Sequence, residues 1–250
     1  MDQVVDTETA REFMKETLDK VDAGTLADIC KDVEAKSAWF QKTLAEEAIP
    51  SLTEDAFEDL LRRIFAARGK ARQQLLAFPL DDMRGWLRDL LYGDHEVDQR
   101  VDTFIARLDG MGENLRMDFA GEVLHFASPD RHWLWARWMW DPRTRTGALP
   151  LVTTPAYGYE GETQGAIYMK VGRAVAFVHE VGEAAGFQSI SRNIFGTDVF
   201  LSCVYVVYAY TVLKMRMTNE FNKVMPGLPE FSRRLLGVNR KGQRKAPVGA

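Results

Sequence analysis

The stretch that decides the fold is GTDVFLSCVYVVYAYTVLKMRM, residues 196–217, because it is apolar on every side. No charged residue occurs between residues 199 and 213. A helix without a polar face has to be surrounded by protein or by lipid. This run is shorter than the about 18–20 apolar residues that cross a bilayer, and it contains three tyrosines. We therefore predict a central buried helix over residues 198–217, with Thr197 or Asp198 as its N-cap, and no membrane span.

The first half of the chain repeats one pattern, in which apolar residues recur three and four positions apart between glycine, proline or capping residues. The cleanest stripe follows Pro50, where Ser51 and Glu54 form a capping-box pattern ahead of the apolar run that starts at Phe57. No strand-like alternation competes with this pattern. The sequence therefore predicts a mainly α fold, a multi-helix bundle around the central helix, with residues 1–127 as its acidic helical half.

Charge is distributed unevenly along the chain. Residues 1–125 contain 16 Lys+Arg against 27 Asp+Glu, net −11, and residues 126–250 contain 16 against 9, net +7, which together give the formal net charge of −4. A basic second half can bind an anionic partner such as nucleic acid. It can equally dock on the acidic first half of its own chain or of a second copy.

The helical segments on either side of the chain's longest loop are too apolar to be exposed, so we predict a single helical domain over residues 1–236. After the acidic half comes a Trp-rich segment and loop over residues 128–165, irregular over 141–165, and then core helices over 166–222. Residues 237–250 are basic and lack apolar anchors, which predicts a disordered tail.

Compartment and redox state follow from the N-terminus and the cysteines. The opening MDQVVDTETAREF is acidic and amphipathic, unlike a secretory signal. Only Cys30 and Cys203 occur, so a disulfide framework is not expected. We expect a cytoplasmic protein with reduced thiols.

The segment RHWLWARWMWDPRTR, residues 131–145, gathers four of the six tryptophans and four arginines. We predict a short helix here, capped by Ser128 or Asp130 and ended by Asp141-Pro142. Trp and Arg dominate the hot spots of protein interfaces, which favours docking on a protein partner or self-association as the function. The alternative is single-stranded nucleic acid, which aromatic rings and arginines also bind. The candidate binding residues are Arg131, Trp133, Trp135, Arg137, Trp138, Trp140 and Arg143.

Packing is a competing interpretation of the same tryptophans. Trp residues two and three positions apart point to several sides of a helix, so part of the set is expected to pack against neighbouring helices. The sequence alone leaves open which rings face outward.

Residues 124–129, LHFASP, resemble the LHF-x-x-P turn of some bacterial helical proteins related to the helix-hairpin-helix DNA glycosylases. In those proteins an aspartate follows the next aromatic position, whereas this chain has Ala136 there. The resemblance therefore implies a helical fold over a short stretch and carries no catalytic residue to this chain.

The sequence HEVGE suggests a third function, that of a metal-dependent enzyme. His179 and Glu183 lie four positions apart on a predicted helix and can hold one metal ion, with Glu180 as a base. A complete site needs a third ligand, for which only residue type nominates His125 or His132. A polar flank beside an apolar stripe gives the same pattern. We expect no cofactor, because phosphate-loop, dinucleotide and hydrolase motifs are missing, and we expect a protein that acts by binding rather than by covalent chemistry.

Overall fold

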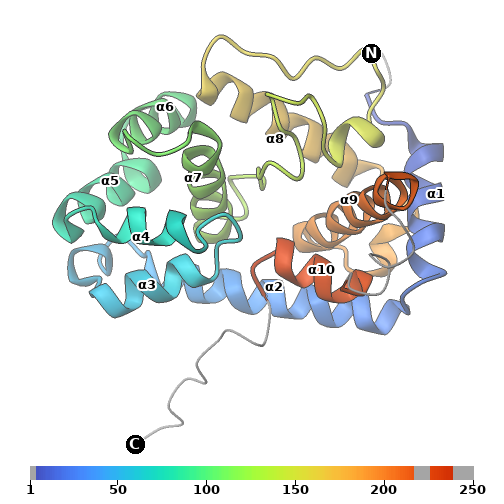
Figure 1. Ribbon diagram of the computed structural model, residues 1–250, viewed down its shortest axis with the longest axis horizontal. Helices are drawn as coiled ribbons and strands as arrows, with labels where there is room; N and C mark the ends of the chain where they lie inside the picture. Colours follow the sequence, from blue (N-terminus) through green and yellow to red (C-terminus); the bar gives the residue numbers. More distant parts are fainter. Residues whose placement is uncertain (1–3, 217–225, 239–250) are drawn as a thin grey trace, which may run out of the picture.

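The part of the chain that the structure describes, residues 4–216 and 226–238 of a computed structural model, is a mainly helical bundle (Figure 1). The apolar periodicity of the sequence predicted this fold class correctly. In chain order the helices are α1 (Thr7–Leu18), α2 (Ala23–Thr43), α3 (Glu54–Arg62), α4 (Lys70–Leu76), α5 (Leu80–Tyr92), α6 (Val97–Arg107), α7 (Glu113–Ala127), α8 (Gln164–Glu180), α9 (Ile194–Arg216) and α10 (Leu228–Leu235), with short 3-10 turns at Ile49–Ser51, Leu149–Leu151 and Phe187–Ser189.

The helices form two sides joined by α2 (Figure 1). On one side, α5, α6 and α7 pack on one another. On the other side, α9 packs against α1, α8 and α10. α2 runs along the lower edge in Figure 1 and packs against α7, α9 and α10, while α6 and α8 join the two sides at the opposite edge. The acidic first half and the basic second half of the chain therefore pack against each other.

The helix predicted over residues 198–217 corresponds to α9, which begins at Ile194 instead of at residue 198. Its middle is apolar and buried, whereas Thr211 near its end is exposed. By length and composition the segment Ile194–Val212 is apolar enough to cross a membrane, and 61% of it is buried inside the protein. Residue 217, the predicted end of this helix, lies outside the described residues.

The N-terminus of α9 lies one turn earlier than predicted because a different residue caps it. The side-chain oxygen of Asn193 accepts a hydrogen bond from the backbone N–H of Gly196 at 3.3 Å. Thr197 instead hydrogen bonds to α8, and Asp198 lies 2.8 Å from the ring of His125 on α7. Both predicted caps were wrong, since these side chains face other helices of the bundle.

The predicted capping box ahead of α3 was also placed too early. Ser51 belongs to the 3-10 turn Ile49–Ser51, and its hydroxyl donates to the carbonyl of Ala48. Thr53 is the N-cap, and its hydroxyl oxygen accepts from the N–H of Ala56 at 3.2 Å.

The Trp-rich segment is not helical, which corrects the prediction for residues 131–145. It consists of turns and irregular backbone, with an isolated bridge between Asp141 and Thr146 at its end. Trp135 donates its ring N–H to the carbonyl of Trp140 at 3.0 Å, and the backbone N–H of Arg137 binds Asp118 at 2.7 Å. One non-helical bond within the segment and one bond to α7 thus take the place of the hydrogen bonds of a helix. The chain then continues irregularly to the start of α8, apart from the turn Leu149–Leu151.

The predicted tail over residues 237–250 begins too early. Val238 is buried, and a Cβ on Gly237 would lie 1.8 Å from the carbonyl oxygen of Arg63. Gly237 also has a φ of 70°, which glycine adopts without strain. The body of the protein therefore extends to Val238. Residues 239–250 of the predicted tail and residues 217–222 of the predicted core helices lie outside the described residues.

Candidate functional site

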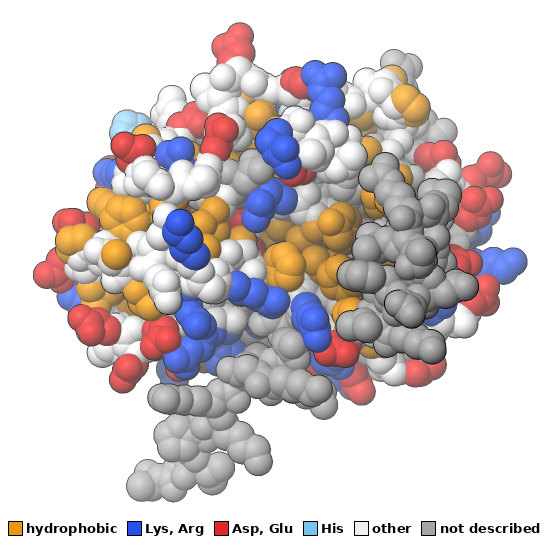
Figure 2. All heavy atoms as spheres, in the orientation of Figure 1, with side chains coloured by type: hydrophobic (Ala, Val, Ile, Leu, Met, Phe, Trp, Pro, Cys, Tyr) orange, Lys and Arg blue, Asp and Glu red, His pale blue; other side chains and the backbone are white. Residues whose placement is uncertain are grey.

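The central pocket is a cavity of about 300 Å³ between the two sides of the bundle. Helix α7 forms one wall, and α9 and α10 form the other. Figure 2 shows hydrophobic side chains gathered near the middle of this face, with Lys and Arg side chains around them. The lining residues are Phe65, Asp118, Arg137, Trp138, Asp141, Thr146, Tyr205, Phe231 and Leu235.

Arg137 is held in the central pocket by Asp118 of α7. The carboxylate of Asp118 accepts one hydrogen bond from the backbone N–H of Arg137 at 2.7 Å and another from its Nε at 2.6 Å. The side chain of Asp118 is only 4% exposed, whereas that of Arg137 is 41% exposed. One edge of the guanidinium is therefore fixed and the rest remains accessible, a preorganised geometry that suits carboxylate or phosphate oxygens.

Burial changes the acidity of the same carboxyl group. It raises the pKa of Asp118 to about 7, although the charge of Arg137 and its hydrogen bonds oppose the rise. Glu122, one turn further along α7, adds to the rise by repulsion. The carboxyl group of Asp118 consequently gains or loses its charge near neutral pH, which changes the net charge that the pocket presents.

Aromatic side chains form the walls of the central pocket. The rings of Trp138 and Tyr205 lie 6.3 Å apart at 60°, and Phe65 and Phe231 also line the cavity. The ring Nε1 of Trp138 is buried and has no hydrogen-bond acceptor within the described ranges 4–216 and 226–238. A buried donor without an acceptor is unfavourable.

A buried ion pair supports the pocket from behind. Lys36 of α2 and Glu122 of α7 lie 2.9 Å apart, with side chains 1% and 2% exposed. Glu122 also accepts from the backbone N–H of Phe65 at 3.1 Å, and Lys36 donates to the carbonyl of Leu236 at 2.9 Å. Burial lowers the pKa of Lys36 and raises that of Glu122. The pair thus ties Phe65, a wall of the pocket, to the α2–α7 core.

A second buried pair fixes the start of the Trp-rich segment. The ring of His125 lies 2.8 Å from the carbonyl of His132 through Nδ1 and 2.8 Å from Asp198 through Nε2. A carbonyl oxygen only accepts, so Nδ1 of His125 carries a proton. This contact holds His132 against α7, five positions before Arg137.

The seven binding residues predicted from the sequence do not form one surface. The structure divides them among the central pocket, a groove of about 260 Å³ beside α8, the core and an exposed turn. Arg137 and Trp138 line the central pocket, Arg131 and Trp133 line the groove, Trp135 and Trp140 are buried, and Arg143 is exposed.

The predicted metal pair lacks the geometry that motivated it. Helix α8 ends at Glu180, so Glu183 lies in the following turn and shares no helical face with His179. His179 Nδ1 lies 2.7 Å from the hydroxyl of Thr197. Among the residues that the structure describes, no three His, Cys, Asp or Glu side chains are grouped to hold a metal.

The sequence did not reveal the pocket residues outside the Trp-rich segment. Asp118, Tyr205 and Phe231 come from three helices and meet only in the folded chain. One local signal was present: Asp118 and Glu122 lie four positions apart within the apolar run MDFAGEVLHF. Two acids on one apolar helix face indicate buried carboxylates with partners.

Comparisons with known proteins found no relatives. No family model matches the chain, and no curated protein or solved structure shows similarity to it. The function is therefore inferred from the geometry of the pocket.

Proposed function

We propose that this protein binds single-stranded nucleic acid and holds one nucleotide in the central pocket. The observation that carries the proposal is an arginine fixed by a buried aspartate between aromatic walls. Aromatic rings stack with bases of any sequence, and an oriented guanidinium binds a phosphate through paired hydrogen bonds. Arg137 supplies the guanidinium. The stacking rings are those of Trp138, Tyr205 and Phe231.

The charge around the pocket supports the same ligand. Figure 2 shows Lys and Arg side chains on several sides of the central hydrophobic area. Arg68 lies with its guanidinium 4.6 Å from the ring of Phe65, and it donates to the carbonyl of Arg234 at 3.0 Å. A basic surface that follows the backbone, combined with stacking rings, is the usual composition of a single-strand binding site. The net charge of −4 does not oppose this, since local charge governs the contact.

Fluorescence anisotropy with labelled oligonucleotides tests the proposal. Single strands of about 16 nucleotides should bind more tightly than the matching duplex, with affinity that falls steeply as salt rises. Arg137→Gln should weaken binding by about tenfold or more, because hydrogen bonds to charged groups contribute about 1.5–3 kcal/mol. Arg88→Gln is the matched control, since Arg88 is exposed on α5 and pairs only with Glu46 in the part of the chain described. Absent binding, salt-independent binding, or an equal loss in both variants would contradict the proposal.

Docking of a protein partner or of a second copy is the second candidate, and the groove beside α8 favours it. This groove contains Arg131, Trp133 and Arg173 next to Met169, which is 46% exposed. Trp, Arg and Met side chains of this kind are enriched at protein interfaces. Light scattering after gel filtration would show a complex that Met169→Glu dissociates and that Leu76→Glu, an exposed apolar site on α4, leaves intact.

A further inference from the structure

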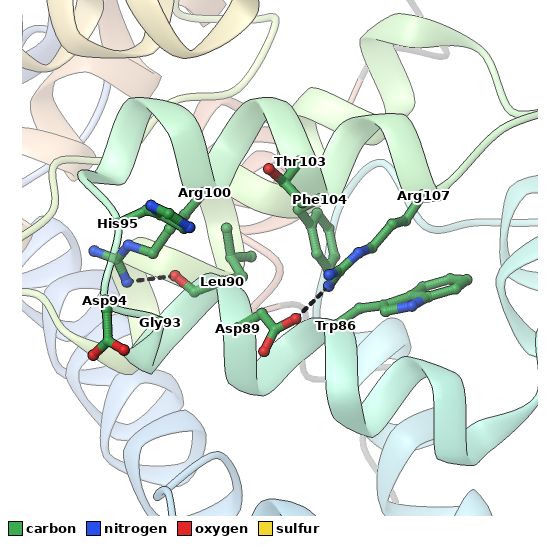
Figure 3. A pocket seen from close by; sticks show the side chains of 10 residues that line it. All are labelled: Trp86, Asp89, Leu90, Gly93, Asp94, His95, Arg100, Thr103, Phe104 and Arg107. Carbon is green, nitrogen blue, oxygen red and sulfur yellow. Dashed lines mark hydrogen bonds and ion pairs between the residues drawn. The ribbon is translucent and has the colours of Figure 1, made fainter.

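A second cavity lies between α5 and α6 and shares no lining residue with the central pocket (Figure 3). Its volume of about 350 Å³ lies at the lower end of the range of about 300–1,000 Å³ that small-molecule sites occupy. We call it the α5–α6 pocket. Its lining residues are Trp86, Asp89, Leu90, Gly93, Asp94, His95, Arg100, Thr103, Phe104 and Arg107.

The floor of the α5–α6 pocket is apolar and rigid. Leu90 and Phe104 are 1% exposed each, so their packing in the core fixes them. The ring of Trp86 lies at one end and packs edge-on against Phe78, with centroids 5.4 Å apart at 71°. A flat apolar group of a ligand can lie on this floor beside Trp86.

The other end of the pocket is cationic. Arg100 donates from Nη1 to the carbonyl of Leu90 at 2.6 Å, and its Nε is buried without a hydrogen-bond acceptor in residues 4–216 and 226–238. Figure 3 shows the ring of His95 beside this guanidinium. An imidazole carries at least one N–H donor in either charge state. Donors from two side chains therefore converge at this end.

The loop between α5 and α6 is shaped to accommodate Arg100. A Cβ on Gly93 would lie 3.3 Å from Cδ of Arg100 and 2.5 Å from the carbonyl oxygen of Asp89. Any side chain at position 93 would therefore displace the loop or the arginine. The glycine lets the guanidinium stem lie close against the end of α5.

The acidic side chains that line the pocket form no ion pair with Arg100 in the part of the chain described, and Glu96, which does not line it, acts on Arg100 only through its charge. Asp89 pairs with Arg107 at 2.6 Å, which neutralises the end near Trp86. Figure 3 shows the carboxylate of Asp94 pointing away from Arg100 and His95. The pocket therefore combines one cationic end, an apolar floor and a neutral ion pair.

We infer that the α5–α6 pocket binds a small organic anion, in which a carboxylate or phosphate group is joined to a flat apolar ring. Arg100 and His95 donate hydrogen bonds to the oxyanion. The ring lies on Leu90 and Phe104 and reaches toward Trp86. This site is independent of the nucleic-acid site proposed for the central pocket.

Titration calorimetry of the full chain with phenyl phosphate tests the inference. We expect saturable binding of phenyl phosphate. Phenol, which lacks the phosphate, and inorganic phosphate, which lacks the ring, should both bind more weakly. His95→Ala should weaken binding about tenfold or more, and Arg100→Lys should do the same because lysine lacks the planar fork of donors. His95 is exposed, so its removal leaves the fold intact and keeps the test valid if Arg100→Lys disturbs the loop.

Two control variants separate this pocket from its surroundings. Gln99→Ala changes an exposed residue of α6 that does not line the pocket, and Arg137→Gln changes the central pocket; neither should alter the affinity. The inference is overturned by the absence of binding up to about 10 mM ligand, by unchanged affinity in His95→Ala, by a loss confined to Arg137→Gln, or by phenol or phosphate binding as tightly as phenyl phosphate.

Discussion

The central pocket and the α5–α6 pocket each contain an arginine paired with an aspartate, but the two aspartates lie in different surroundings. Asp118 is 4% exposed in the first pair and Asp89 is 59% exposed in the second, although the shortest contacts are 2.6 Å in both. The first carboxyl group has a pKa raised by burial. Both pairs consist of the same two residue types, so the difference between them comes from burial. Burial shifts the pKa of the carboxyl group and increases the loss of stability when the pair is broken.

The same contrast extends to the helices around each pocket. Behind the central pocket, Lys36 and Glu122 form an ion pair that is almost fully buried. The α5–α6 region has partly exposed pairs, such as Arg84–Asp81 and Arg107–Asp89. Substitutions in the two regions should therefore change the free energy of unfolding by different amounts, and one of them should raise it.

The largest effect is expected when one member of the buried pair is removed. Lys36→Met leaves Glu122 in the interior without its cation and should lower the free energy of unfolding by about 3–5 kcal/mol, whereas Arg107→Met should lower it by about 1 kcal/mol or less. Urea denaturation followed by circular dichroism measures both. Replacing both partners, Lys36→Met with Glu122→Leu, should recover part of the loss. Equal losses of stability in Lys36→Met and Arg107→Met would show that burial does not distinguish the two ion pairs.

The next effect concerns pH. The folded-state pKa of Asp118, about 7, lies above its ordinary value of 3.8, so the folded protein binds this proton more tightly than the unfolded chain does. The resulting stabilisation is fully present below pH 3.8 and is lost as pH rises through 7.

Asp118→Asn removes this titration and provides the test. Between pH 5 and pH 8, wild type should lose about 2–3 kcal/mol of stability relative to Asp118→Asn. Asp89→Asn, which removes a carboxylate from the exposed pair, is the matched control. The measurement is urea denaturation across this pH range. Parallel curves for wild type and Asp118→Asn would show that the carboxyl group does not titrate there.

A smaller loss is expected where α7 touches the Trp-rich segment. A Cβ on Gly121 would lie 2.3 Å from the backbone oxygen of Trp135, so Gly121→Ala forces the segment away from the helix. Overpacking of this kind costs about 1–3 kcal/mol. Thermal denaturation should show the loss, and oligonucleotide binding should weaken with it because the segment carries Arg137. A melting temperature equal to that of wild type would contradict the close contact.

The smallest effect has the opposite sign. Gly85 lies in α5, and a Cβ at this position would meet no atom within 4 Å. Gly85→Ala should therefore raise the free energy of unfolding by about 0.5–1 kcal/mol, since alanine has the higher helix propensity. The same thermal measurement detects it. A destabilised Gly85→Ala would mean that the surface of α5 is covered in the protein.

Local patterns predicted the helices well and their contacts poorly. The apolar stripe from Phe57 to Leu61 identified α3, because helical periodicity is a property of neighbouring residues. The caps were missed at α9, where Asn193 takes the role assigned to Thr197 or Asp198. Several polar residues near a helix end satisfy the same sequence rule, and only packing selects among them.

The candidate site was predicted in part. Arg137 and Trp138 were named from composition and line the central pocket, but the helix expected to carry them does not form. Asp118 accepts a hydrogen bond from the backbone N–H of Arg137. The two residues lie 19 positions apart, so no pattern among neighbouring residues predicts this contact. Docking and nucleic-acid binding stay predictions that the experiments above address, and the cytoplasmic location stays a prediction.

The contact between Lys36 and the carbonyl of Leu236 joins positions separated by 200 residues. During synthesis, the ammonium group of Lys36 therefore reaches this acceptor only after 200 further residues have been made. A ribosome that has made α2 and α7 but not α10 carries an unfinished core, whose apolar surface is a target for chaperones. Contacts of such long range also slow folding. Helix α10 thus determines when this part of the core closes, as well as how it is packed.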